Sequence, residues 1–176
     1  LVERALNGLR PCALGDPAKA GRALTDFFHQ RWAALAEARG FRPDEVAAVA
    51  AAGFDEVSDA WARLSALRDV RRHPDFAPLS VAFKRAANLL KQAEKKGDTP
   101  SGVVQEALFR TDAERTLGAR VAERAASAEP LLAVRDYPSV LSGLVSLRAA
   151  VDDFFVSVVV MDPDSALRQN RLRLLS

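Results

Sequence analysis

Apolar side chains recur every three or four residues along most of this chain, a spacing typical of helices that bury one face. The longest such stripe consists of Leu141, Leu144, Leu147, Val151, Phe154 and Phe155. The pattern predicts helices over residues 20–39, 43–52, 55–72, 76–95 and 111–128, one starting at 137 and one starting near 163. No segment shows the period of two that a half-buried strand needs. We therefore predict an all-α bundle of about seven helices.

The same periodicity predicts which side of each helix is buried. In the first helix the predicted inner face contains Leu24, Phe27, Phe28, Trp32 and Leu35, and in the helix over 76–95 it contains Leu79, Phe83, Ala87 and Leu90. Thr111 and Glu114 have the spacing of a capping box, and Asp162 before Pro163 is predicted to cap the last helix.

The first 19 residues differ from the rest, because Gly8, Pro11, Gly15 and Pro17 interrupt them and no period is sustained. We expect residues 1–19 to be a linker or the edge of a preceding module, and residues 20–176 to form one all-helical domain. The first residue is Leu1 rather than Met, so we expect a fragment of a longer protein.

Catalytic motifs are absent from the sequence. His29 and His73 lie outside any metal-ligand spacing, and Asp152 and Asp153 are adjacent on a helix and point in different directions. Cys12 is the only cysteine, which excludes an internal disulfide and fits a reducing cytosol. No apolar run is long enough to span a membrane. We expect no catalytic residue, no metal ligand and a cytoplasmic location.

Charge is distributed in blocks, although the net charge is only +2. Residues 61–96 contain nine basic and three acidic side chains, and residues 165–176 contain three basic and none acidic. Two basic blocks in an otherwise acidic chain indicate local contact with a polyanion, or solvated helix faces whose long side chains cover apolar surface.

Three segments resemble a known family. They are the C-terminal Val151-Asp-Asp-Phe-Phe followed by Ala166-Leu-Arg-Gln-Asn-Arg-Leu172, the run Lys84-Arg85-Ala-Ala-Asn88 with Arg63 and Arg71 before it, and residues 27–43. Together they are similar to the C-terminal anticodon-binding domain, of the DALR type, in the β subunit of bacterial glycyl-tRNA synthetase. The chain departs from that family at Phe83, where a small polar residue is usual, and at Val156, where an aspartate is usual.

The resemblance implies a function in protein biosynthesis. The domain would bind the anticodon stem-loop of tRNA(Gly), while glycylation with ATP and magnesium takes place on the separate α subunit. The fragment would then hold no cofactor, would be monomeric by itself, and would reach the α subunit through the full-length β subunit. Glycine anticodons end in two cytosines, and unstacked bases can be read on their Watson–Crick edges.

The residues predicted to contact RNA are basic or carry an amide: Arg63, Arg71, Lys84, Arg85, Asn88, Arg168 and Arg171. For Asn88 a structural role is an equal alternative, and for Arg168 a buried contact with an acidic residue is another. Two other functions stay open for the whole chain. One is a helical module that binds a partner protein, and the other is the related domain of arginyl-tRNA synthetase.

Overall fold

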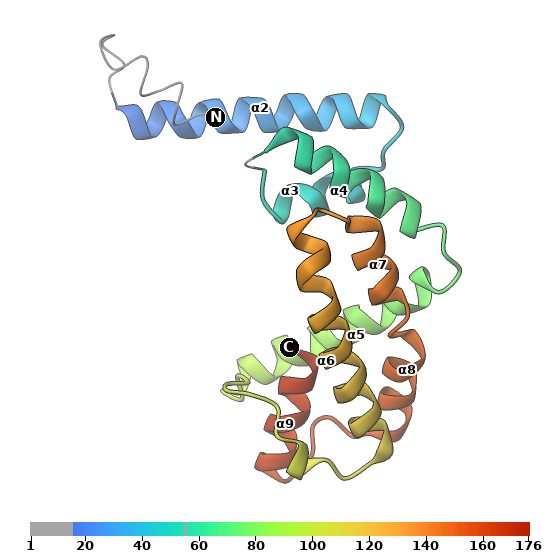
Figure 1. The fold of residues 1–176 in the computed structure, drawn as a ribbon. Helices are drawn as coiled ribbons and strands as arrows, with labels where there is room; N and C mark the ends of the chain where they lie inside the picture. The colour runs from blue at the N-terminus through green and yellow to red at the C-terminus, as the bar shows by residue number, and fades with distance from the viewer. Residues whose placement is uncertain (1–15, 55) are drawn as a thin grey trace. The chain divides into compact units, whose positions relative to one another are not determined.

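The computed structural model describes residues 16–54 and 56–176, and in these residues it contains eight α-helices, one 3-10 turn and no strand. The prediction of an all-α fold is confirmed (Figure 1). Cys12 and most of the predicted linker lie outside the described residues. The helices are α2 (Pro17–Ala38), α3 (Pro43–Ala51), α4 (Val57–Val70), α5 (Phe76–Lys95), η1 (Glu106–Leu108), α6 (Asp112–Ala133), α7 (Tyr137–Val145), α8 (Arg148–Ser157) and α9 (Ser165–Leu175).

Two glycines end helices by taking a left-handed backbone conformation. After α2, Gly40 has φ +80°, and the Phe41 N–H donates to the carbonyl of Ala36 at 3.1 Å. After α5, Gly97 has φ +79°, and the Asp98 N–H donates to the carbonyl of Ala93 at 2.9 Å. This arrangement satisfies carbonyls that the helix itself leaves open. It also fixes the position of Asp98 just beyond α5.

The described residues form two compact units, which meet in the chain between Asp69 and Val70. Each unit has its own core of buried apolar residues. The sequence predicts one domain over residues 20–176, because no proline-rich or glycine-rich linker separates α4 from α5.

In the first unit the core surrounds two tryptophans. The rings of Trp32 and Trp61 meet edge to face with centroids 5.7 Å apart, and Ala36 and Leu64 are fully buried beside them. The predicted inner face of α2 is wrong in part, since Phe27 and Phe28 are 59% and 41% exposed and Leu35 is also exposed. The core gathers around the second half of α2, where Trp32 and Ala36 point toward it.

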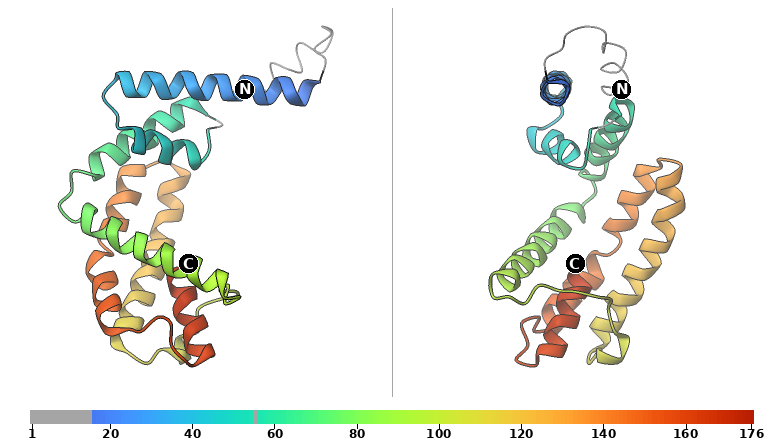
Figure 2. Two further views of the ribbon diagram at one scale, coloured as in Figure 1. Left: turned by 180° about the vertical axis from the view of Figure 1, so that it is seen from behind. Right: turned by 90° about the vertical axis from the view of Figure 1, so that its left-hand side faces the viewer.

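In the second unit α6 packs against α7, α8 and α9, while α5 packs against α8 and α9 (Figures 1 and 2). Phe154 on α8 is fully buried in this core. The buried face of α5 is formed by Leu79, Ala82, Ala86 and Ala93. The predicted face is therefore wrong at Phe83 and Ala87, because the small side chains Ala82 and Ala86 take the inner positions and the larger ring remains outside.

The predicted long helix after residue 137 is in fact two helices, α7 and α8. At the break, the Ser146 hydroxyl donates to the carbonyl of Gly143 at 2.6 Å, and the Leu147 N–H donates to Leu144 rather than to Gly143. This shift to the tighter hydrogen-bond pattern turns the chain between the helices. The apolar stripe continues across the turn, which is why periodicity alone does not reveal it.

Replacing Phe154 with alanine should lower the free energy of unfolding by roughly 3–5 kcal/mol, since the ring is fully buried and its loss leaves a cavity. Val156→Ala is the matched control, because Val156 lies on the same helix and is 87% exposed. Urea denaturation followed by circular dichroism gives the free energy of unfolding of both variants. Equal stability of the two variants would contradict the observed packing of α8.

Candidate nucleic-acid interface

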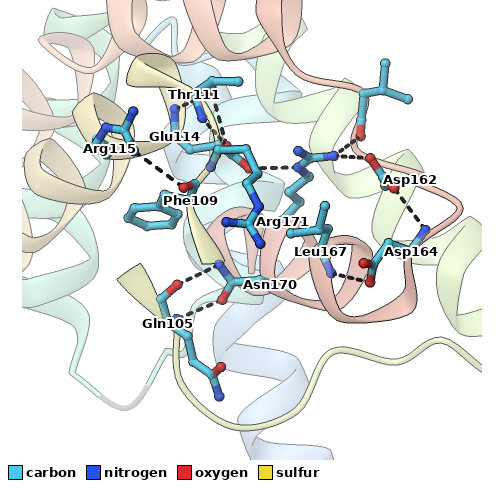
Figure 3. Close-up of polar contacts among 12 residues, drawn as sticks. Gln105, Phe109, Thr111, Glu114, Arg115, Asp162, Asp164, Leu167, Asn170 and Arg171 are labelled. Carbon is cyan, nitrogen blue, oxygen red and sulfur yellow. Dashed lines mark hydrogen bonds and ion pairs between the residues drawn. The ribbon is translucent and has the colours of Figure 1, made fainter. Parts of the chain in front are cut away.

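Helix α9 is held to the rest of the second unit by polar side chains (Figure 3). The Asn170 side chain makes two hydrogen bonds to the backbone of Gln105, one accepted from the N–H at 2.7 Å and one donated to the carbonyl at 2.9 Å. Asn170 is almost completely buried. A buried amide that satisfies a backbone donor and acceptor in this way fixes the segment before η1 against α9.

Arg171 lies at the centre of this contact region. Its Nε donates to Glu114 at 2.7 Å, and one terminal nitrogen donates to Asp162 at 2.6 Å and to the carbonyl of Val159 at 3.0 Å. Glu114 and Arg171 are only 1% and 6% exposed. The second oxygen of Glu114 accepts from the backbone N–H groups of Arg110 and Thr111, at 2.7 and 2.8 Å. The predicted capping box at the start of α6 is therefore confirmed, and its glutamate also pairs with α9.

These contacts shift the ionisation of all three charged groups. Burial raises the pKa of Glu114, but the hydrogen bonds from Arg171 and from the backbone outweigh it, so that pKa lies below its ordinary value. For Asp162, the hydrogen bond from the Asp164 N–H and that from Arg171 lower the pKa. Burial lowers the pKa of Arg171, yet its two carboxylate partners raise it overall. The ionised forms are the ones that the fold stabilises.

Helix α9 starts two residues later than an Asp162 cap would place it. Asp164 is the N-cap, and its side chain accepts from the N–H groups of Ala166 and Leu167 at 2.8 and 3.3 Å. The predicted cap at Asp162 is wrong. That carboxylate instead accepts from the Asp164 N–H at 2.9 Å and pairs with Arg171.

Arg168 also contacts groups within the chain. It donates to Asp98 at 3.1 and 3.4 Å and to the carbonyl of Asp162 at 2.6 Å. Both of the predicted RNA-contacting arginines on α9 therefore hold loops in place: Arg168 binds the chain after α5, and Arg171 binds the start of α6. Their prediction as RNA contacts remains a prediction.

The solvent face of α5 is different, because its cations have no such partners. Lys84, Asn88, Lys91 and Lys95 follow one another at spacings of four, three and four residues, so they share one side of the helix. All four are exposed, and within the described residues no ion pair or hydrogen bond of their side chains is found. We call these four residues the α5 stripe.

Arg85 lies beside the α5 stripe and is anchored on one side. Its guanidinium stacks on the Phe155 ring of α8, 4.5 Å from the ring centroid. Phe155 is buried, whereas Arg85 is exposed. Stacking on a fixed ring restricts the guanidinium while its N–H groups can still donate outward.

The two predicted arginines that precede α5 lie elsewhere. Arg63 belongs to the first unit, where it pairs with Asp59 at 2.8 Å and donates to the carbonyl of Gly53 at 2.7 Å. Arg71 lies half-buried in the turn after α4, in the second unit. The structure therefore brings Lys84, Arg85 and Asn88 together on α5. On α9, by contrast, Arg168 and Arg171 make contacts with other segments of the chain.

From the sequence, Lys91 and Lys95 are interpreted as a solvated helix end rather than as RNA contacts; in the structure they continue the α5 stripe beyond Asn88. Their spacing from Lys84 is the signal that identifies them. In the part of the chain that the structure describes, no three His, Cys, Asp or Glu side chains gather as they would around a metal ion. Among the described helices, none combines the length and the apolar character that a membrane span requires.

Comparison with known proteins adds independent findings. Residues 79–176 match the family model described as DALR anticodon binding domain. The chain is 43% identical over 99% of its length to a protein of Anaeromyxobacter sp. (strain K) named glycine–tRNA ligase beta subunit. Proteins of the same name from Geotalea uraniireducens and Acidobacterium capsulatum are 41% and 43% identical over 86% and 80% of this chain. The chain spans about a quarter of the length of these relatives, at 24%, 21% and 20%.

Glu114→Gln should lower the free energy of unfolding at neutral pH by up to about 3 kcal/mol, because it removes the buried carboxylate partner of Arg171 and leaves Asp162 as the remaining carboxylate that pairs with it. Glu123→Gln is the matched control, since Glu123 lies on the same helix in exposed ion pairs worth less than about 1 kcal/mol. Chemical denaturation of both variants measures the difference. If Glu114→Gln and the wild type unfold at the same denaturant concentration, the buried pair does not stabilise the domain.

The pH dependence has a defined sign. The folded pKa of Glu114 lies below its ordinary value of 4.5, so the unfolded chain takes up this proton first as the pH falls. The stabilisation is complete above that ordinary value and is lost as the pH falls through the folded pKa. Wild-type stability should decline below about pH 5 more steeply than that of Glu114→Gln.

Proposed function

The chain belongs to the DALR anticodon binding domain family, and from this we propose that it binds the anticodon stem-loop of tRNA(Gly) as part of a glycine–tRNA ligase β subunit. The observation that supports the proposal most directly is the α5 stripe. It lies within the residues that match the family, and its lysines make no ion pair with any residue that the structure describes. Phosphates of an RNA loop are the natural partners of such cations.

Within this proposal, Asn88 and Arg85 read the bases and the lysines bind the backbone. An exposed amide offers two donors and an acceptor, which suits the N3, O2 and N4 groups of a cytosine. The stacked guanidinium of Arg85 supplies further donors from a restricted position. Phosphate contacts position the RNA, whereas base contacts discriminate among sequences.

Four other residues that were predicted to contact RNA would make a smaller contribution to binding. Arg63, Arg71, Arg168 and Arg171 already have contacts within the chain. An arginine with several donors can keep an internal contact and still offer one N–H to a phosphate. These four would add to RNA binding only where such a donor is accessible.

For the whole protein we propose the activity that the relatives' name states, ligation of glycine to tRNA. Glycine, ATP and magnesium would bind on the α subunit, and this chain would be non-catalytic and would hold no cofactor. It would be a monomer by itself and would join the α subunit through other parts of the β subunit. The assembly would work in the cytoplasm.

Binding of a glycine anticodon stem-loop should weaken as salt rises, with a slope of roughly −2 to −3 in log K against log salt for three or four phosphate contacts. Lys84→Ala should weaken all loops alike and reduce the size of that slope by about 0.7. Lys19→Ala is the matched control, because Lys19 is an exposed lysine of the first unit outside the family match. Fluorescence anisotropy of a labelled stem-loop, measured at several salt concentrations, gives the binding constant of the wild type and of each variant. Equal slopes for the two variants would move the phosphate contacts away from α5.

Asn88→Ala should instead change how well the chain distinguishes one anticodon sequence from another. It should reduce the preference for a C-C anticodon over a changed one by roughly 1–3 kcal/mol, with the salt slope unchanged because no charge is lost. Competition binding with paired stem-loops gives this difference. Unaltered preference in a variant that melts as the wild type does would place base reading elsewhere.

A further inference from the structure

Phe83 is the aromatic residue on α5 that the core leaves outside. The residue is 45% exposed, although the helix buries the neighbouring Leu79, Ala82 and Ala86. Exposing so much of an aromatic ring forgoes part of the stabilisation that burial would give. The position is therefore one where an external partner could gain from the ring.

The helix around Phe83 leaves the ring uncovered. One turn further along, Ala87 is exposed and too small to cover it. One turn back, the Ser80 hydroxyl donates to the carbonyl of Phe76 at 2.9 Å and so stays against the backbone. Phe83 is therefore partly covered by the protein and partly open to solvent, which is the arrangement of a stacking platform.

Charge indicates what kind of partner would use this platform. Lys84 follows Phe83 directly, and Lys91 lies two turns beyond it, so the ring borders the α5 stripe. An apolar protein partner would have to pair or desolvate these lysines. A nucleic acid strand brings phosphates for the lysines and a flat base for the ring within one nucleotide.

We propose that Phe83 stacks on an unpaired base of the bound RNA loop. The inference rests on the proposed function, and it adds a contact of a different kind. Stacking needs only the flat face of a base, so it contributes affinity without reading the sequence. Phe83 therefore adds affinity by holding a base against α5, whereas the discrimination among bases stays with Asn88 and Arg85.

The test uses the 176-residue chain and a glycine anticodon stem-loop that carries 2-aminopurine at one loop position at a time. Phe83→Leu keeps an apolar side chain and removes the aromatic ring. It should weaken binding by roughly 5- to 150-fold. It should also abolish a change in 2-aminopurine fluorescence that the wild type produces at one position. The salt slope should stay the same, because neither residue is charged.

Two further variants complete the experiment. Phe83→Trp should restore both affinity and the fluorescence change, because it restores a ring. Val81→Ala is the matched control, since Val81 is an exposed apolar residue of α5 without a ring, and it should bind as the wild type does. Thermal melts establish that each variant is folded.

The outcomes separate the two proposals. Wild-type affinity and an intact fluorescence change in Phe83→Leu would overturn the stacking role and leave anticodon binding in place. Equal losses in Phe83→Leu and Phe83→Trp would also overturn it, because the effect would then be one of shape. A wild-type chain that binds no stem-loop would overturn the proposed function, and the stacking role with it.

Discussion

The second unit depends on a buried ion pair between Arg171 and Glu114. Removing two charges from water costs several kcal/mol for each ion, and only close, fully hydrogen-bonded partners compensate for that cost. Here Glu114 accepts from Arg171, from two backbone N–H groups and from a hydroxyl, while Arg171 also reaches Asp162. One arginine on α9 thus fixes both the first turn of α6 and the loop that leads into α9. A packing of these helices that separated the two groups would leave each charge buried without its partner.

The cations on α9 and those of the α5 stripe differ in whether the fold uses them. Those on α9 are committed to the fold, since Arg168 and Arg171 hold carboxylates and carbonyls from distant segments. Those of the α5 stripe make no such contacts among the described residues. The fold thereby presents α5 as a rigid helix, buried on one side through small side chains, with its charges available to an external anion. The family match over residues 79–176 covers both groups.

Much of the fold could be predicted from periodicity. The bounds of α5 match those predicted, and the capping box of α6 was recognisable because its two residues are close in sequence. The inner face of α5 was not predictable, because Phe83 is more hydrophobic than Ala82, and the smaller residue is favoured only by tertiary packing of α5 against α8 and α9. The role of Arg171 was also hidden, since its partner Glu114 lies 57 residues away and nothing in the local pattern pairs them. Sequence therefore identified the basic positions and, for Arg168, the alternative of an internal acidic partner, but it did not identify Asp98 as that partner or the internal role of Arg171.

The freedom of the α5 stripe has a consequence for how such a domain can diverge. Because Lys84, Lys91 and Lys95 make no ion pair or hydrogen bond with the described residues, substitutions there should change the affinity for a ligand at little cost in folding stability. Arg171 has no such latitude, since any replacement must be matched at Glu114 at the same time. The affinity for a ligand can therefore change through single substitutions on α5. The buried contact between α6 and α9 changes only when Arg171 and Glu114 are substituted together.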